Sequence, residues 1–504
     1  MDTLSSLMAG FSVAILPLNL ALIFGGCFLG TLIGALPGIG PVNGVAILIP
    51  LTFALGLNPT SAMILLSAIY YGCMYGGRIT AILMNIPGDE PALMTTLDGY
   101  PMAVKGQAAD ALAISGMASF VGATLATIGL TLFAPMLAKA AIHFGPADYF
   151  ALYVMAFATI GGIAGADPRK TLLAALLGLM LATVGLDPAT GVARYTFGSF
   201  NLYDGFDPIV ALVGLFAISE ILFFLEEKLT GGPKVPKGNL LPRWRSLTIG
   251  MGASLRGSVV GFVAGILPGA GASLGAVLSY GLEKRLSDKK GTFGKGDPRG
   301  VAAPEAGNNA ASGGALIPML TLGVPGSGTT AVMLAMLISL NVQPGPLLFE
   351  RNPDLVWGLV ASLYLANLVL LVLNLPLIGL FTRMLAMPVW ALMPLVVVIS
   401  FLGVYAITHA VFDLLIMVGF GILGYVLRKL DFSLIPVVLG LLLGMDMENN
   451  LRRALSISGG DFMVLFESRI ALVIYGVTLA FLSLSLWLSR RTPALLADSD
   501  VSED

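Results

Sequence analysis

The chain has 504 residues, of which 57% are hydrophobic and only 11% are charged, and its mean hydropathy is +0.90. Soluble domains carry about 25% charged residues, so this composition excludes an ordinary soluble protein and indicates an integral membrane protein. The formal net charge of −2 gives no sign of nucleic-acid binding. Cys27 and Cys73 lie in apolar stretches, where neither a disulfide nor a metal site is expected.

The apolar stretches are long enough to form helices that cross a bilayer, which takes about 20 residues each. At that length the chain holds roughly ten to twelve crossings or half-crossings. It lacks the short alternating segments of an outer-membrane barrel. We therefore expect an all-α polytopic membrane protein that spans the lipid bilayer many times.

Four Pro-Gly pairs interrupt long apolar stretches, two in each half of the chain and in the same order. They are Pro37-Gly38, Pro87-Gly88, Pro268-Gly269 and Pro325-Gly326. Such a pair stops a helix, because proline lacks an N–H group and glycine adds no stiffness. Broken backbone inside lipid is tolerated only where protein buries it or where it lines a wet cavity. Matching breaks in two halves are therefore the best pointer to a transporter's substrate site.

A polar stretch at 226–245, rich in lysine and arginine, divides the chain in two. We predict a first membrane repeat over 1–225, a cytoplasmic linker over 226–245 and a second membrane repeat over 246–490. The acidic tail at 491–504 is expected to be disordered. Within the first repeat, Asp98-Gly99-Tyr100-Pro101 is typical of a turn.

The basic residues predict how the breaks enter the membrane. Cytoplasmic loops are enriched in lysine and arginine, and basic loops flank the segment 246–281 on both sides. That segment is then a re-entrant hairpin with its break near mid-membrane. Its counterpart around Pro37 has no basic residue nearby, which fits a hairpin entering from the other face and hence two inverted repeats. The alternative is that each segment spans once with a kink.

Small polar residues follow the breaks, where new helices begin. Free N–H groups and the helix dipole attract carboxylates at such an N-terminus. The alternative is that Asn43, Asp89, Ser273 and Ser327 only cap their helices. Glycines at the breaks also let backbone approach a ligand closely. The candidate substrate-binding residues are Pro37, Gly38, Gly40, Asn43, Arg78, Asn85, Gly88, Gly269, Gly271, Ser273, Gly326, Ser327, Thr329 and Thr330.

Arg78 lies between apolar runs, and an ionisable residue at membrane depth is a functional candidate. Its planar guanidinium suits a substrate carboxylate. The alternatives are an arginine that reaches to the interface, or one paired with Asp89 or Glu90.

Oxygen-bearing side chains near the second break of each half suit a hard cation such as Na⁺. A polar helix start is the alternative explanation for the asparagines. Na⁺ is slightly favoured over H⁺ as the coupling ion, because few buried titratable groups accompany Asp89 and Glu305, although a proton route through Asp89 stays open. No other cofactor and no metal site is expected. The candidate coupling-ion residues are Asp89, Glu305, Asn308 and Asn309.

Several classes of protein function do not fit this sequence. The chain has no Walker A loop, and its two histidines, His143 and His409, lie far apart, so neither ATP hydrolysis nor a zinc protease is expected. We expect no enzyme. A channel usually has rings of one charge or repeated filter carbonyls, and a receptor would bind solute without moving it. A transporter is the favoured class.

Several motifs taken together resemble the large membrane subunit of the tripartite tricarboxylate transporter family, TctA, essentially from end to end. They include Gly34-Ala-Leu-Pro-Gly-Ile-Gly-Pro-Val-Asn-Gly44, Ala303-Pro-Glu-Ala-Gly-Asn-Asn309, Leu320-Thr-Leu-Gly-Val-Pro-Gly-Ser327 and Glu448-Asn-Asn-Leu-Arg-Arg-Ala454. The resemblance implies a multi-pass secondary transporter of the bacterial inner membrane, driven by an ion gradient. It implies a small membrane subunit and a periplasmic solute-binding protein as partners. It also implies a carboxylate substrate, with citrate or another tricarboxylate first and a di- or aromatic carboxylate as the alternative.

Overall fold

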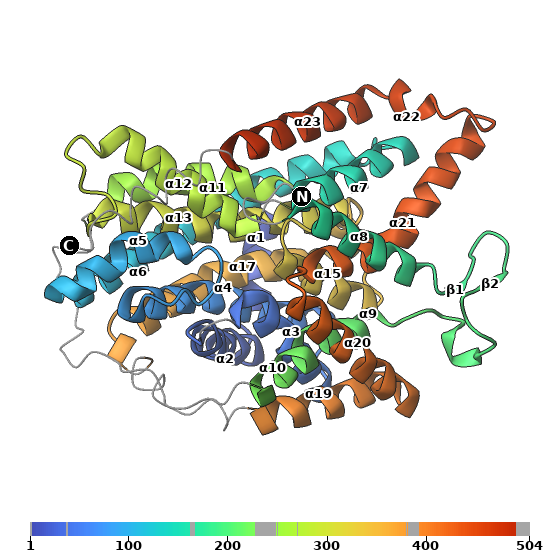
Figure 1. The fold of residues 1–504 in the computed structure, drawn as a ribbon, viewed down its shortest axis with the longest axis horizontal. Coiled ribbons are helices and arrows are strands. Elements are labelled where there is room, and N and C mark those ends of the chain that lie inside the picture. The colour runs from blue at the N-terminus through green and yellow to red at the C-terminus, as the bar shows by residue number, and fades with distance from the viewer. Residues whose placement is uncertain are drawn as a thin grey trace.

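The computed structural model describes residues 3–36, 39–161, 167–226, 248, 250–269, 271–379, 381 and 393–489. Pro37, Gly38, nearly all of the predicted linker at 226–245 and the acidic tail at 491–504 lie outside the described residues. The regular secondary structure of the described part is helical apart from two short antiparallel strands, in which Gly185 of β1 (Gly185–Leu186) pairs with Arg194 of β2 (Ala193–Arg194). This confirms the all-α prediction (Figure 1).

The helices up to the middle of the chain are α1 (Thr3–Ala14), α2 (Pro17–Gly34), α3 (Gly40–Ala54), α4 (Pro59–Met84), α5 (Leu93–Met102), α6 (Ala108–Ala141), α7 (Pro146–Gly161), α8 (Pro168–Ala182), α9 (Pro208–Leu212) and α10 (Ser219–Glu226). Short segments of other helix types are η1 (Ala103–Gln107), η2 (Phe200–Leu202) and η3 (Val213–Ile218). The later helices are α11 (Met251–Ile266), α12 (Gly271–Ser287), α13 (Pro298–Gly314), α14 (Leu316–Leu322), α15 (Gly328–Ser339), α16 (Leu348–Arg351), α17 (Pro353–Asn374), α19 (Met393–Thr408), α20 (Val411–Lys429), α21 (Ile435–Ile457), α22 (Val464–Glu467) and α23 (Arg469–Ser489).

Four of the described helices begin with one shared signal, an Asp or Asn cap whose side chain bonds the first turn and which is followed by proline. The cap side chain accepts a hydrogen bond from a backbone N–H of the first turn, and proline supplies the φ angle that this turn needs. The caps are Asn58, Asp167, Asp207 and Asp297.

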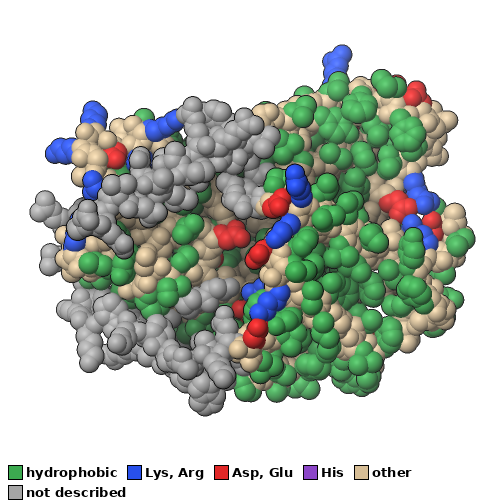
Figure 2. Space-filling model, viewed as in Figure 1, with side chains coloured by type: hydrophobic (Ala, Val, Ile, Leu, Met, Phe, Trp, Pro, Cys, Tyr) green, Lys and Arg blue, Asp and Glu red, His purple; other side chains and the backbone are tan. Residues whose placement is uncertain are grey.

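Five helices among the described residues are long and apolar enough to cross a membrane. They are Pro17–Gly34, Leu93–Ala141, Pro208–Glu226, Pro353–Asn374 and Val411–Lys429. Several other apolar helices are shorter because they start or stop at the Pro-Gly breaks, as α3, α11 and α15 do. Figure 2 shows hydrophobic side chains spread over the right half of the molecule, with charged side chains in a central column and toward both ends. The protein is thus a multi-pass membrane protein.

The two arms of the predicted second hairpin, α11 and α12, fold back on each other. Arg256 near the start of α11 pairs with Glu283 near the end of α12 at 2.7 Å, and Ser279 donates a hydrogen bond of 3.0 Å to the Gly257 carbonyl. In the first half, Ile33 of α2 lies against Gly44 of α3 beside the break. Beyond that contact, α3 packs against α4, α15, α19 and η3.

Glycines spaced four residues apart make close helix contacts in both halves. A β-carbon added at Gly30 of α2 would lie 2.3 Å from the Ile69 carbonyl oxygen of α4. One added at Gly261 of α11 would lie 2.0 Å from the Gly307 carbonyl oxygen of α13. Small residues allow this backbone approach between helices in a membrane. The same register continues on both sides, where Gly26 and Gly34 meet Leu65 and Cys73, and Gly257 and Gly265 meet Ala303 and Ala311.

The two halves are interleaved, because each lends a long helix to the other. α6 packs along α13, where a β-carbon at Gly122 would lie 2.2 Å from the Ala306 carbonyl oxygen. α17 packs along α4, where Asn367 accepts a hydrogen bond of 3.2 Å from the Tyr75 hydroxyl. The shared packing register and this exchange support an internal repeat, while the boundaries at 1–225 and 246–490 and the inversion stay predictions.

Candidate functional site at the four breaks

The breaks that are far apart in sequence meet in space. Within each half the hairpin tip touches the second break: a β-carbon at Gly40 would lie 3.6 Å from Asp89, and the Gly271 N–H donates to the Gly326 carbonyl at 3.2 Å. This brings four of the predicted regions into two pairs, one in each half.

Two further contacts join the breaks of one half to the breaks of the other. Ser273, at the start of α12, donates a hydrogen bond of 3.1 Å to Glu90 after the first-half break. A β-carbon at Gly328, at the start of α15, would lie 3.1 Å from the Val42 side chain of α3. Each hairpin therefore contacts the second break of both halves, as a shared binding centre requires.

The break after α4 is shaped by Asn85 and Gly88. Asn85 ends the helix in the left-handed region, at φ 58°, a conformation that asparagine tolerates better than most residues. A β-carbon at Gly88 would lie 2.5 Å from the Gly34 carbonyl oxygen, so only glycine lets this segment lie against the tip of α2. Asp89 follows, and its Oδ1 accepts a hydrogen bond from the Ala92 N–H at 3.0 Å.

The break after α14 is its counterpart. Gly323 ends the helix in the left-handed region at φ 69°, where the first half has Asn85. Ser327 and Thr330 form a reciprocal capping box at the start of α15: Ser327 Oγ accepts from the Thr330 N–H, and Thr330 Oγ1 accepts from the Ser327 N–H. Thr329 is buried in the same turn. Ser327 therefore caps α15, as the alternative interpretation of this residue predicts.

Asn43 does not cap its helix. Its side-chain amide donates a hydrogen bond of 3.2 Å to Glu220, which also forms an ion pair of 2.5 Å with Arg428. The guanidinium of Arg428 lies 4.3 Å from the centre of the Phe223 ring. Asn43 thus connects the first-half tip to α10 and α20.

Arg78 is completely buried and is held by neutral protein groups. Its guanidinium donates hydrogen bonds to the Leu112 carbonyl at 2.8 Å, to Ser115 Oγ at 2.6 Å and to Asn374 Oδ1 at 3.1 Å. These partners come from α6 and α17, the two helices that the halves exchange. In this structure Arg78 therefore fastens α4 to both exchanged helices.

Glu305 and the two asparagines lie buried on α13. The Glu305 carboxylate accepts hydrogen bonds from Thr95 at 2.6 Å and Ser119 at 3.1 Å, and Asn309 donates to the Glu305 carbonyl at 3.0 Å. Asn308 Oδ1 and Asp89 Oδ2 are buried, and neither has a hydrogen-bond partner among the described residues. An unsatisfied buried oxygen is costly, so each needs a ligand or water.

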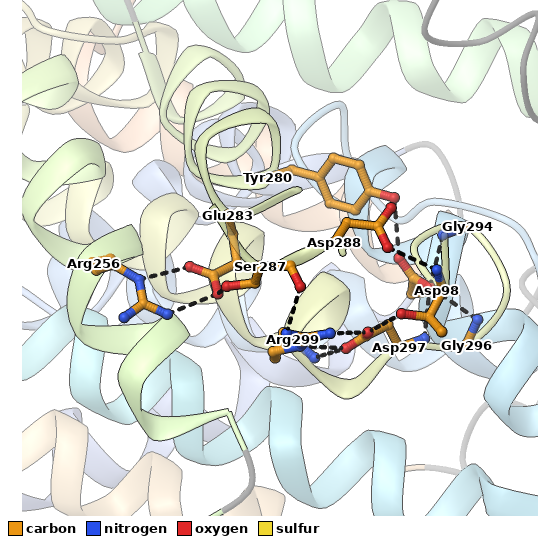
Figure 3. A network of polar contacts seen from close by, with 11 residues as sticks. Asp98, Arg256, Tyr280, Glu283, Ser287, Asp288, Gly294, Gly296, Asp297 and Arg299 are labelled. Carbon is orange, nitrogen blue, oxygen red and sulfur yellow. Dashed lines mark hydrogen bonds and ion pairs between the residues drawn. The ribbon is translucent and has the colours of Figure 1, made fainter. Parts of the chain in front are cut away.

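Asp98 belongs to a polar network that the sequence did not reveal (Figure 3). Its carboxylate accepts hydrogen bonds from the N–H groups of Gly294, Gly296 and Asp297 at 2.9, 2.9 and 2.7 Å, and from the Tyr280 hydroxyl at 3.0 Å. The prediction of a turn here is wrong. α5 stays helical through Leu93–Met102, because Asp98 bonds the loop after α12 rather than its own backbone.

Asp297 links this network to the start of α13. Arg299 forms an ion pair with it at 2.6 Å, and Thr292 donates to it at 2.6 Å. Burial raises the pKa of Asp297, but the hydrogen bonds from Arg299 and Thr292 outweigh burial and hold that pKa below its usual value.

Comparison with known proteins identifies a family and two relatives. A family model described as the tripartite tricarboxylate transporter TctA family matches residues 20–439. An uncharacterised 52.8 kDa protein from the TAR-I ttuC' 3' region of Agrobacterium vitis is 40% identical over 98% of each chain. An uncharacterised protein from the TAR-II ttuC' 3' region of the same organism is 41% identical over 46% of this chain and 96% of its own length. No solved structure matches the chain.

Proposed function

The chain belongs to the tripartite tricarboxylate transporter TctA family, and on that premise we propose that it takes up citrate or another tricarboxylate by secondary active transport. The substrate is held between the four breaks, and part of the protein moves relative to the rest to expose the site to either side.

The observation that carries this proposal is the convergence of the breaks. Glu90 meets Ser273, Asp89 meets Gly40, and Gly271 meets Gly326. Helices α3, α12 and α15 all begin at this centre. The positive ends of their helix dipoles favour the carboxylates of a substrate over a neutral solute.

A cation drives the uptake, and Na⁺ is the favoured ion. Asp89 Oδ2 and Asn308 Oδ1 support this, because each is a buried oxygen that lacks a hydrogen-bond partner in the described chain. Carboxylate and amide oxygens are suitable ligands for a hard cation. Protonation of Asp89 is the competing mechanism, in which H⁺ takes the place of Na⁺.

The chain works in the bacterial inner membrane with two partners. A small membrane subunit accompanies it, and a periplasmic solute-binding protein delivers the substrate. Family membership supports this arrangement, since the family is that of a tripartite system.

Uptake into proteoliposomes tests the proposal. The chain and its partner subunits are reconstituted, radiolabelled citrate is added outside, and Na⁺ and H⁺ gradients are imposed separately. Accumulation above the external concentration with one gradient supports a cation-coupled importer, and equilibration without accumulation indicates a channel. A panel of di- and aromatic carboxylates tests the alternative substrates, and failure of every carboxylate contradicts the proposal.

A further inference from the structure

A cavity of about 600 Å³ lies beside the second-half break and contains none of the predicted site residues. Small-molecule sites have volumes of about 300–1,000 Å³. Its walls come from α7, α15, α21 and the segment before α16, and Gly323 at the end of α14 forms part of its lining. Its polar side chains that favour an anion are Asn341, Gln343, Arg351, Asn449, Asn450 and Arg453.

The guanidinium groups of the two arginines of the cavity, Arg351 and Arg453, are not engaged in hydrogen bonds or close ion pairs within the described chain, although Arg453 interacts electrostatically with Asp446. The adjacent Arg452 differs, because it pairs with Asp187 at 3.1 Å and with Glu448 at 2.6 Å. One arginine of the Glu448–Ala454 motif thus fastens the β1–β2 hairpin to α21, and the next one lines the cavity.

One acidic side chain, Asp446, also lines the cavity. Asn450 bonds its backbone carbonyl at 2.8 Å. Two arginines against one aspartate leave an excess of positive charge, and the amides of Asn449 and Gln343 add neutral donors. Guanidinium groups bind carboxylates through paired hydrogen bonds, so the chemistry of this wall selects a small anion with more than one carboxylate.

The cavity lies toward the end of the molecule opposite the basic loop between α12 and α13. In Figure 1, α7 and α21 lie toward the right-hand end, whereas α12 and the loop after it lie toward the left-hand end. That loop holds Lys289, Lys290 and Lys295. Basic loops mark the cytoplasmic side of a membrane protein. The cavity then faces the side from which an importer receives its substrate.

We propose that this cavity is an entry subsite, in which Arg351 and Arg453 bind carboxylates of the substrate before it reaches the breaks. This inference rests on the proposed carboxylate transport. Gly323 both lines the cavity and ends α14 immediately before Pro325 and Gly326, so the subsite is continuous with the second-half break.

Direct binding tests the subsite. The full chain is placed in nanodiscs of uncharged phosphatidylcholine, and the dissociation constant of radiolabelled citrate is measured for Arg351→Gln, Arg453→Gln and the double variant. We expect the double variant to bind citrate about tenfold more weakly, since two charge-assisted contacts are lost. Arg453→Lys keeps the charge and should lose less than Arg453→Gln.

Arg452→Gln is the matched control. It removes an arginine at the adjacent position, and its ion pairs hold the hairpin rather than the cavity, so citrate affinity should stay within about twofold of the unmodified protein. An equal loss of citrate affinity in Arg452→Gln and Arg453→Gln would overturn the subsite, because the loss would then come from a general disturbance of α21 and not from the cavity.

The remaining outcomes separate the two proposals. Citrate binding that is unchanged in the double variant overturns the entry subsite and leaves the transporter proposal standing. An unmodified protein that binds no di-, tri- or aromatic carboxylate overturns both. A loss that appears only in nanodiscs containing anionic phosphatidylglycerol identifies a lipid headgroup as the occupant and overturns the subsite as well.

Discussion

Ser273 at the start of α12 donates a hydrogen bond of 3.1 Å to Glu90, which follows the break after α4. The two residues belong to different halves of the chain and to different breaks, so their contact joins the halves beside the proposed substrate site. Movement of one half against the other must stretch or break this bond.

Removing the Ser273 hydroxyl should cost a modest amount of stability. We expect Ser273→Ala and Glu90→Gln each to lower the free energy of unfolding by about 0.5–1.5 kcal/mol, the usual worth of one hydrogen bond. The double variant should lose little more than the larger single loss, because both changes remove the same bond. Denaturant titration in detergent measures all three, and fully additive losses would show that the two side chains do not interact.

Helix α2 offers a matched pair of glycines for testing the packing register. A β-carbon at Gly30 would lie 2.3 Å from the Ile69 carbonyl oxygen, whereas one at Gly25 meets nothing within 4 Å. Gly30→Ala should therefore destabilise the protein by about 1–3 kcal/mol through overpacking. Gly25→Ala should be neutral or stabilising by up to about 1 kcal/mol. Thermal unfolding compares them, and equal effects would contradict the close approach of α2 and α4.

Asp89 should carry the ion dependence of transport. Asp89→Asn keeps the size of the side chain and removes the charge, so we expect gradient-driven accumulation to be lost while citrate exchange across the membrane persists. Counterflow and Na⁺-driven uptake in the same proteoliposomes measure the two activities. Full Na⁺-driven accumulation by Asp89→Asn would remove this residue from the coupling site.

Asp297 should contribute a stability that disappears in acid. Its pKa is held below its usual value, so its contribution is present above about pH 4 and is lost as the pH falls through the lower, folded-state pKa. Asn is also a good helix cap, so Asp297→Asn changes mainly the charge. The melting temperature of Asp297→Asn should lie below that of the unmodified protein at pH 7, and the gap should narrow as the pH falls below about 4. A constant gap over this range would argue against the ion pair with Arg299.

Local chemistry made part of this structure predictable from the sequence. A Pro-Gly pair inside a long apolar stretch favours a helix break, so the breaks at Pro87, Pro268 and Pro325 are predictable without a fold. Basic loops on both sides likewise indicated that α11 and α12 form a hairpin. The meeting of the breaks followed from the assumption that broken backbone in a membrane lines a shared site.

Partners distant in sequence were not predictable. The sequence around Asp98 is typical of a turn. Its hydrogen-bond partners, the Tyr280 hydroxyl and N–H groups between Gly294 and Asp297, lie in the second half and are not indicated by any local pattern. Arg78 donates hydrogen bonds to Ser115 and Asn374 rather than pairing with Asp89 or Glu90, which are nearer in sequence. This is because α6 and α17 each pack against helices of the other half. No local sequence pattern predicts that α6 and α17 pack against the opposite half.

The central claim is that substrate binds where the four breaks meet, and substrate protection of a cysteine tests it most directly. Cys27 and Cys73 are buried and are replaced by alanine, and Ser273→Cys then supplies one reactive thiol at the junction. Ser456→Cys, at an exposed position of α21, is the control. We predict that citrate with Na⁺ slows alkylation at position 273 and leaves alkylation at position 456 unchanged. Unchanged alkylation at position 273, in vesicles that accumulate citrate, would place the substrate elsewhere and contradict the account.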